Sequence, residues 1–387
     1  MHTSTIGLWA LAAGIASAKT CFNATVEVDI SARNGVFDNI KTPETNLDAT
    51  TFALASSKTG GNITEEALSG YATVGGRYNI STQYCMPKSS GPGGHSLQIL
   101  THGMGFDKSY WDLPYHNFNY SYVDYVLSRG YHTFSYDRLG IGKSSHGDAK
   151  NEIQSFLEIE ALAELTRKVR DGSIEGIQKP SKVVHVGHSF GSAQTVALSA
   201  MYPDLSDALV LTGFSASIAS MPVFLSGANF QQANLNHPPW IGYLVNSDIG
   251  TNKFLFFYPG NFDEGILSYA EKNKQPMTVG ELMTMTGLPT SSPFTGPVYV
   301  IDGENDIAFC GGACSYTTDS SASIPAGVKA VFPKASAFTA YIQPETGHGI
   351  NLHYNSTGAY QQINDFLGAQ GLVSASHDHE ARHHHDF

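Results

Sequence analysis

The sequence predicts an α/β fold in which helices cover both faces of a mostly parallel sheet. From Ser96 onward, short continuous apolar segments alternate with helical segments, as they do when parallel strands are buried on both faces. Within this region a strand, a sharp turn and a helix meet around residues 187–191. The alternation stops between residues 218 and 290, which predicts an insertion into the sheet-forming region.

Length and charge limit the possible functions. A chain of 387 residues is long enough for one large α/β domain with an insertion, or for two domains. The formal net charge is -12, and no stripe rich in lysine and arginine is present to neutralise phosphates. We therefore expect no nucleic-acid partner.

The first 18 residues have the pattern of a secretory signal. A short apolar run at residues 6–13 is followed by Ala16-Ser17-Ala18, a small-x-small cleavage pattern that would leave Lys19 near the mature start. The run is too short to span a bilayer, so we expect a secreted, extracellular protein without a stable membrane anchor. Asn-x-Ser/Thr sequons make five asparagines candidate glycosylation sites: Asn23, Asn62, Asn79, Asn119 and Asn355.

The four cysteines are expected to form disulfides, because an oxidising compartment favours bridged pairs. Cys310 and Cys314 lie in one small loop, which leaves Cys21 and Cys85 to pair with each other. The alternative for Cys310 and Cys314 is zinc binding. No second Cys/His pair lies nearby at ligand spacing, so we expect no metal site there.

Residues 19–217 are predicted to form the first part of the core. Its early section contains antiparallel strands at 24–30, 71–74 and 77–84, with a helix over 49–68 that is interrupted at Gly60-Gly61. The core strands and helices that follow are expected in alternation. Their expected positions are strands at 97–100, 131–136, 182–186 and 208–214 and helices at 122–127 and 153–170.

Residues 218–290 lack this alternation and are rich in large apolar side chains, which indicates a cap; the alternative is additional core. The core is expected to resume over 291–375, with strands at 298–301 and 338–342 and a helix at 358–367. Residues 376–387 form a His-rich tail whose polar composition favours disorder over metal binding.

Ser189 is the candidate nucleophile. It lies in Gly187-His188-Ser189-Phe190-Gly191, between a β-branched strand and a small-residue helix. A serine at the apex of such a turn projects its hydroxyl from the top of a sheet, and the glycines let strand and helix pass closely. The alternative is a chance match in a glycine-rich chain.

A serine hydroxyl needs a base, and the base needs an acid to fix its tautomer. Asp306 follows one predicted strand, and His348 follows the last strand in a glycine-flanked turn, so both would lie at the sheet edge near Ser189. Asp302 and Glu304 are alternative acids, and His102 and His353 are alternative bases. His188, within the turn, is expected to line the pocket.

Acyl transfer also requires two N–H donors for the developing oxyanion. We expect one from Phe190, directly after the nucleophile, and the other from the loop His102-Gly103-Met104-Gly105, at Met104. Gly103 of the same loop is a candidate substrate-binding residue.

Together these motifs resemble the α/β-hydrolase superfamily. The resemblance covers residues 96–217 and 297–367 and includes Asp137-Arg138-Leu139-Gly140-Ile141-Gly142-Lys143-Ser144 and the chain order Ser189, Asp306, His348. It implies an eight-stranded, mostly parallel sheet, a helical cap after the sixth strand, and no cofactor. It places the nucleophile, acid, base and oxyanion loop on Ser189, Asp306, His348 and Met104. Secretion and sequons resemble an extracellular, fungal-type member.

The sequence therefore predicts a secreted serine hydrolase that cleaves an ester of a hydrophobic small molecule. Alternatives are a peptidase, a transferase or a lyase on the same site, or a non-catalytic binding protein with this fold. A peptidase would be favoured by an acidic cap residue that binds a free amine. The candidates are Asp248, Asp263, Glu264, Glu271 and Glu281.

Overall fold

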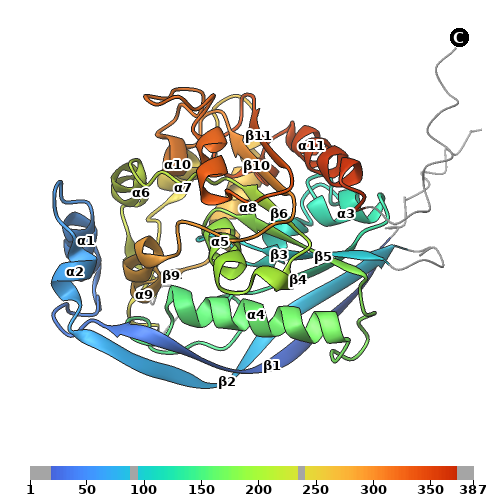
Figure 1. The fold of residues 1–387 in the computed structure, drawn as a ribbon. Helices are drawn as coiled ribbons and strands as arrows, with labels where there is room; N and C mark the ends of the chain where they lie inside the picture. Colours follow the sequence, from blue (N-terminus) through green and yellow to red (C-terminus); the bar gives the residue numbers. More distant parts are fainter. Residues whose placement is uncertain (1–18, 88–94, 234–239, 373–387) are drawn as a thin grey trace, which may run out of the picture.

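An eight-stranded sheet forms the core of the computed structural model, which describes residues 19–87, 95–233 and 240–372 (Figure 1). The strand order is β1-β2-β4-β3-β5-β6-β10-β11. The six strands from β4 to β11 are parallel, and β2 runs antiparallel to both of its neighbours, β1 and β4, so the predicted mostly parallel sheet is confirmed. The strands are β1 (Lys19–Val36), β2 (Gly70–Pro87), β3 (Ser96–Thr101), β4 (His132–Tyr136), β5 (Lys182–His188), β6 (Ala208–Thr212), β10 (Val298–Gly303) and β11 (Phe338–Gln343).

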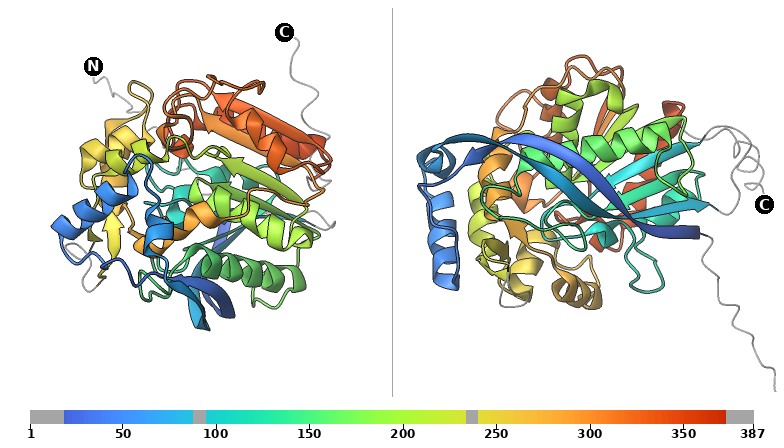
Figure 2. Two further views of the ribbon diagram at one scale, coloured as in Figure 1. Left: turned by 60° about the vertical axis from the view of Figure 1, so that its left-hand side comes forward. Right: turned by 90° about the horizontal axis from the view of Figure 1, so that it is seen from below.

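Helices cover both faces of this sheet. α4 (Ser155–Asp171) and α5 (Phe190–Met201) lie on one face, and α3 (Tyr122–Leu127) and α11 (Ser356–Ala369) lie together on the other (Figures 1 and 2). α4 buries an apolar stripe and ends at a glycine in the left-handed conformation. Short helical turns complete the core: η1 (Lys108–Trp111), η2 (Pro203–Leu205), α10 (Ile307–Cys310), η5 (Pro325–Val331) and η6 (Ile350–Leu352).

The two early strands are longer than the sequence pattern indicated. The expected strands at 24–30, 71–74 and 77–84 are parts of β1 and β2, which pair over 18 residues each. Their register sets Cys21 opposite Cys85, and these two form a disulfide. A second disulfide joins Cys310 and Cys314, so both predicted pairings are present and no thiolate remains there for zinc.

Two helices, α1 (Asn46–Ser56) and α2 (Ile63–Ala67), connect β1 to β2, as the interrupted helical pattern predicted. They lie at the far end of the long β1/β2 pair, against the segment inserted between β6 and β10 (Figures 1 and 2). Thr64 Oγ1 donates a hydrogen bond to the Met283 carbonyl at 2.8 Å. The N-terminal helices are therefore attached to a segment about 200 residues further along the chain.

The inserted segment is not purely helical. It contains α6 (Met221–Ala228), α7 (Ile249–Phe256), α8 (Glu264–Asn273), α9 (Val279–Thr284) and the turn η4 (Met285–Gly287). It also contains a small antiparallel sheet of β7 (Gln231–Gln232), β8 (Tyr243–Val245) and β9 (Met277–Thr278). The central strand is a buried run of aromatic, leucine and β-branched residues, a composition that suits a strand.

Two sequence predictions lie outside the described residues: the signal at 1–18 and the tail at 376–387. Within the described ranges, no helix combines the length and hydropathy needed to cross a membrane. Asn23, Asn62, Asn79 and Asn119 are exposed. Asn355 is half-buried, and its Nδ2 donates to the Pro344 carbonyl at 2.8 Å, a hydrogen bond that a glycan on this nitrogen would disturb.

Candidate active site

Ser189 occupies a strained turn between β5 and α5. Its φ of 56° lies in the left-handed region, which is unusual for a residue with a side chain. Its N–H donates to the Thr212 carbonyl of β6 at 2.9 Å, which fixes the turn on the sheet. A Cβ at Gly187 would lie 2.5 Å from the Gly191 carbonyl oxygen, so the glycines are required for the close approach of strand and helix.

Ser189, His348 and Asp306 form one hydrogen-bonded chain. His348 Nε2 lies 2.7 Å from Ser189 Oγ, and His348 Nδ1 lies 2.5 Å from Asp306 Oδ2. Ser189 is 9% exposed, and the other two residues are almost fully buried. The three side chains follow β5, β11 and β10, whose carboxyl ends share one edge of the sheet.

The carboxyl group of Asp306 is ionised in this arrangement. Burial by itself raises its pKa, but attraction to His348 and hydrogen bonds lower it, and the net pKa lies below the usual value. Asp306 Oδ1 also accepts the Phe309 N–H at 2.8 Å. Because an ionised carboxylate only accepts hydrogen bonds, Nδ1 of His348 carries the proton and Nε2 is free to accept one from Ser189.

The two alternative histidines organise the backbone instead. Burial lowers the pKa of His102 to about 3, and its Nε2 accepts the Arg138 N–H at 3.0 Å. Burial likewise lowers the pKa of His353 to about 4. Nε2 of His353 accepts from Gly347 at 3.1 Å and Tyr258 at 2.9 Å, which shapes the loop that carries His348.

Of the two alternative acids, Glu304 lies toward the surface and accepts the Glu345 N–H at 3.0 Å. Asp302 is fully buried, with a carboxylate oxygen within 4.8 Å of Asp306 and His348. Burial and repulsion from Asp306 hold the pKa of Asp302 well above its usual value. The pair therefore contains one neutral carboxyl, Asp302, and one ionised carboxylate, Asp306.

Replacing Asp302 with asparagine is expected to change how stability depends on pH. In the unfolded chain an aspartic acid ionises near pH 4, whereas folded Asp302 keeps its proton to higher pH. The native state then binds more protons than the unfolded state, so this residue lowers the free energy of unfolding as pH rises above about 4. An amide keeps a donor and does not titrate. We expect the free energy of unfolding of Asp302→Asn, relative to that of wild type, to increase between pH 4 and pH 8.

Urea unfolding across this pH range measures that difference. Asp365→Asn, on the exposed face of α11, is the control and should follow the wild-type profile. A pH profile of Asp302→Asn parallel to that of wild type would contradict a protonated Asp302.

His188, which the sequence placed in the pocket wall, is fully buried behind His348. Its ring stacks on Tyr110 at a centroid distance of 4.3 Å, and its Nδ1 contacts Thr212 Oγ1 at 3.1 Å. Burial, with a contribution from neighbouring His348, lowers its pKa well below the usual value, so His188 is neutral. It supports the ring of His348 and lines neither of the two cavities described below.

The loop after β3 packs directly against Ser189. A Cβ at Gly103 would lie 2.8 Å from Ser189 Cβ, so only glycine allows this approach. Among the hydrogen bonds of the described residues, none uses the backbone N–H of Met104 or of Phe190, the first residue of α5. Both donors beside Ser189 are thus available to an oxygen atom of a ligand.

A buried ion network beneath Phe190 was not anticipated from the sequence. Arg138 Nη1 pairs with Glu158 of α4 at 2.7 Å and with Glu281 of α9, and all three side chains are almost fully buried. The Arg138 guanidinium lies 4.8 Å from the centre of the Phe190 ring. Gln194 of α5 donates to Glu158 at 2.7 Å. The network connects the inserted segment to the helix that begins next to Ser189.

The acidic residues considered as amine-binding groups have other surroundings. Asp248 and Asp263 cap α7 and α8, and Glu264 is exposed in the first turn of α8. Glu271 pairs with Lys274 at 2.6 Å, and Glu281 pairs with Arg138. None of the five lines either of the two cavities described here.

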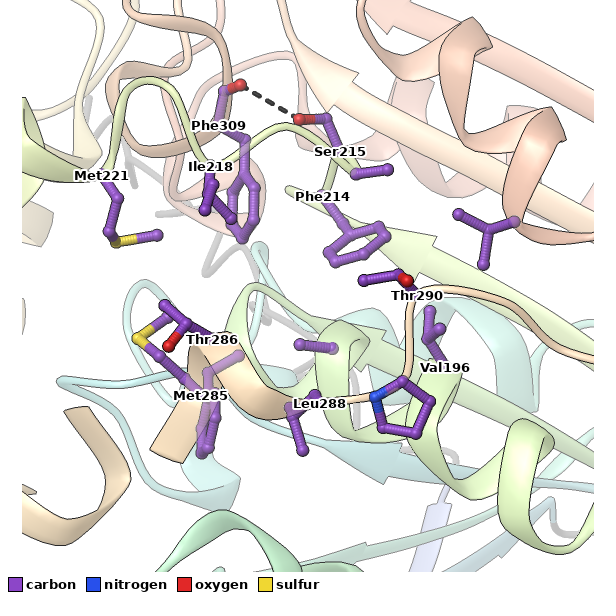
Figure 3. Close-up of a pocket in the computed structure, with 15 residues that line it drawn as sticks. Val196, Phe214, Ser215, Ile218, Met221, Met285, Thr286, Leu288, Thr290 and Phe309 are labelled. Carbon is purple, nitrogen blue, oxygen red and sulfur yellow. Dashed lines mark hydrogen bonds between the residues drawn. The ribbon is translucent and has the colours of Figure 1, made fainter. Parts of the chain in front are cut away.

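Figure 3 shows a cavity of about 90 Å³ whose lining includes Phe309, and Phe190, the residue after Ser189, also lines it. Figure 3 shows Phe214 and Phe309 on one side of it and Met285 and Leu288 on the other. The lining of this cavity is mainly aromatic and aliphatic, with only neutral polar side chains at Ser215, Thr286 and Thr290.

Comparison with known proteins agrees with this architecture. The sequence profile of the α/β hydrolase family matches residues 98–356, more than half of the chain. The chain belongs to the α/β hydrolase family. The match contains Ser189, Asp306 and His348, and it excludes β1, β2, α1 and α2.

Solved α/β hydrolases show the same fold at low identity. An esterase from Thermogutta terrifontis is 15% identical with a TM-score of 0.50, covering 76% of this chain and 94% of the esterase chain. An epoxide hydrolase from Vigna radiata is 13% identical with a TM-score of 0.50, and the match covers 76% of this chain and 95% of the epoxide hydrolase chain. No curated protein sequence matches this chain.

Proposed function

We propose that this α/β hydrolase cleaves carboxylic esters of neutral, apolar small molecules through an acyl-enzyme, with Ser189 as nucleophile, His348 as base and Asp306 as acid. One observation carries the proposal. The hydrogen-bonded chain from Ser189 Oγ to His348 and on to Asp306 has the connectivity that activates a serine hydroxyl.

In the first half-reaction Ser189 Oγ attacks the ester carbonyl carbon while its proton moves to His348 Nε2. The imidazolium is stabilised by ionised Asp306, and the oxyanion accepts hydrogen bonds from the N–H groups of Phe190 and Met104. The C–O bond to the alcohol then breaks, and the alcohol leaves with the proton from His348. Water, deprotonated by His348, attacks the acyl-enzyme and releases the carboxylic acid and free Ser189. These steps use protein groups and water, without a cofactor.

The surroundings of the cluster favour an apolar ester over a peptide. The cavity that includes Phe190 and Phe309 is lined by apolar and neutral polar side chains, which suit an uncharged organic group. The acidic residues of the insert that were candidates for binding a free amine cap helices, pair with lysine or arginine, or lie exposed, and none lines either cavity. We further propose that the protein is secreted, since the pattern at residues 1–18 and two disulfides are typical of secreted chains.

Labelling with a fluorophosphonate probe tests the mechanism. The wild-type protein is expected to be labelled, and Ser189→Ala is not. Ser192→Ala is the matched control, because Ser192 lies in the first turn of α5, three residues after Ser189, and its hydroxyl donates to the Thr212 carbonyl at 2.9 Å. A folded wild-type protein that is neither labelled nor able to hydrolyse p-nitrophenyl esters would contradict ester hydrolysis and favour a binding protein.

A further inference from the structure

A second cavity, of about 280 Å³, adjoins the cavity that Phe190 and Phe309 line. The two cavities share four lining residues: Ile218, Met221, Met285 and Thr286. Ile218 is 62% exposed, so the shared rim reaches the surface. The two cavities therefore adjoin each other between α6 and the turn after α9, and together they are called the groove.

Two residues that line the inner end of this groove, Phe190 and Phe309, are neighbours of the Ser189 cluster. Phe190 directly follows Ser189, and the Phe309 N–H donates to Asp306. The Phe309 ring centroid lies 5.7 Å from that of His348. The inner end of the groove and the groups proposed to react thus share Phe190 and Phe309 as neighbours.

Five of the twelve residues that line the outer cavity lie outside the region matched by the family profile. Asn62, Ile63 and Thr64 of the α1–α2 segment line it together with residues of α6 and α9. The segment is fixed to the insert, because Thr64 Oγ1 donates to Met283 and the Gln232 N–H donates to Asn46 Oδ1 at 3.0 Å. The outer wall is therefore part of the folded structure before any ligand binds.

The chemistry of the wall changes along the groove without introducing charge. The inner wall is mainly aromatic and aliphatic, whereas the outer wall adds the hydroxyl and amide groups of Ser56, Asn62 and Thr64. None of the residues that line either cavity is charged. An ionic tail would lose its hydration there without gaining a counter-ion.

We propose that this groove binds the elongated, uncharged tail of the ester substrate, with α1 and α2 determining which tails are accepted. The inference rests on the proposed ester hydrolysis. It assigns a specificity role to a segment that lies more than 100 residues from Ser189 in the sequence.

Two series of esters test the proposal: p-nitrophenyl esters from acetate to dodecanoate, and acetates of alcohols of the same lengths. In the series whose varied chain occupies the groove, kcat/KM is expected to rise about tenfold or more as that chain grows from four to eight carbons. The added methylenes are buried in the groove and contribute to binding. An ester of equal length that ends in a carboxylate should react at least about tenfold more slowly than its methyl-ended counterpart.

Ile218→Trp and Met285→Trp place a bulky ring at the junction of the two cavities. Each is expected to lower kcat/KM about tenfold or more for the longest esters and much less for the shortest ester, so that the dependence of kcat/KM on chain length becomes flatter. Val223→Trp is the control, because Val223 lies on α6, five residues after Ile218, is 46% exposed and lines neither cavity.

Two results separate the inference from the proposed function. If the short ester is hydrolysed but neither series depends on length, or both junction variants keep the wild-type profile, the groove proposal is wrong and ester hydrolysis stands. If no ester is hydrolysed and the fluorophosphonate does not react, both proposals are wrong.

Discussion

Replacing His348 with alanine is expected to lower kcat for ester hydrolysis by about 10⁶-fold, because His348 is the one group among the described residues within hydrogen-bond distance that can take the proton from Ser189 Oγ. Ser189→Ala should lower it as much, and the double variant should be no worse than either single variant. Residues that act as one unit lose their whole contribution when one of them is removed.

Asp306→Asn is expected to lower kcat by about 10⁴-fold, since an amide can donate to Nδ1 and favours the tautomer with the proton on Nε2. Steady-state kinetics with a short p-nitrophenyl ester measures all four variants. Circular dichroism checks that each is folded. Additive losses in the double variant would show that Ser189 and His348 do not act together.

The second large effect is expected on stability, from replacing Arg138 with methionine. This change leaves Glu158 and Glu281 buried without their cation, and such a loss costs about 3–5 kcal/mol of unfolding free energy. Urea unfolding measures it. The triple variant Arg138→Met, Glu158→Gln, Glu281→Gln should recover a large part of the loss, because the two amides carry no charge that needs the Arg138 cation.

Arg77→Met provides the contrast. The Arg77 side chain is 73% exposed and lies 3.8 Å from Glu27 and from Asp29, so its replacement should cost less than about 1 kcal/mol. Equal losses for Arg77→Met and Arg138→Met would show that the buried network has no special role in stability.

Local patterns were sufficient for the sheet and for the positions of Ser189, Asp306 and His348. Strand, turn and helix around Ser189 have a steric basis that lies within a few residues, and the two other side chains follow strands recognisable by continuous apolar runs. The small sheet in the insert was missed because its strands have only two or three residues, too few for a periodic signal.

Contacts between distant segments could not be read from the sequence. Nothing in the pattern of α2 indicates that Thr64 contacts Met283, 219 residues away. Similarly, Glu281 has the spacing of a capping-box residue at a helix N-terminus, and it does form one with Thr278. Only the structure shows that the Glu281 carboxylate also contacts Arg138. The protonated state of Asp302 depends in the same way on burial and on its distance from Asp306.

The inserted segment is hydrogen-bonded to the core through its backbone at several places. The Gln275 N–H donates to the Gly105 carbonyl at 3.0 Å, the Gly280 N–H to the Ala149 carbonyl at 2.7 Å, and the Gly349 N–H to the Phe256 carbonyl at 2.8 Å. Outward rotation of the segment as a rigid unit would break all three bonds and separate Glu281 from Arg138. We therefore expect ligands to enter and leave when side chains at the rim, such as Met285, change rotamer, while the inserted segment stays in place. Amide protons of Gln275 and Gly280 should exchange with solvent as slowly as those of the central strands.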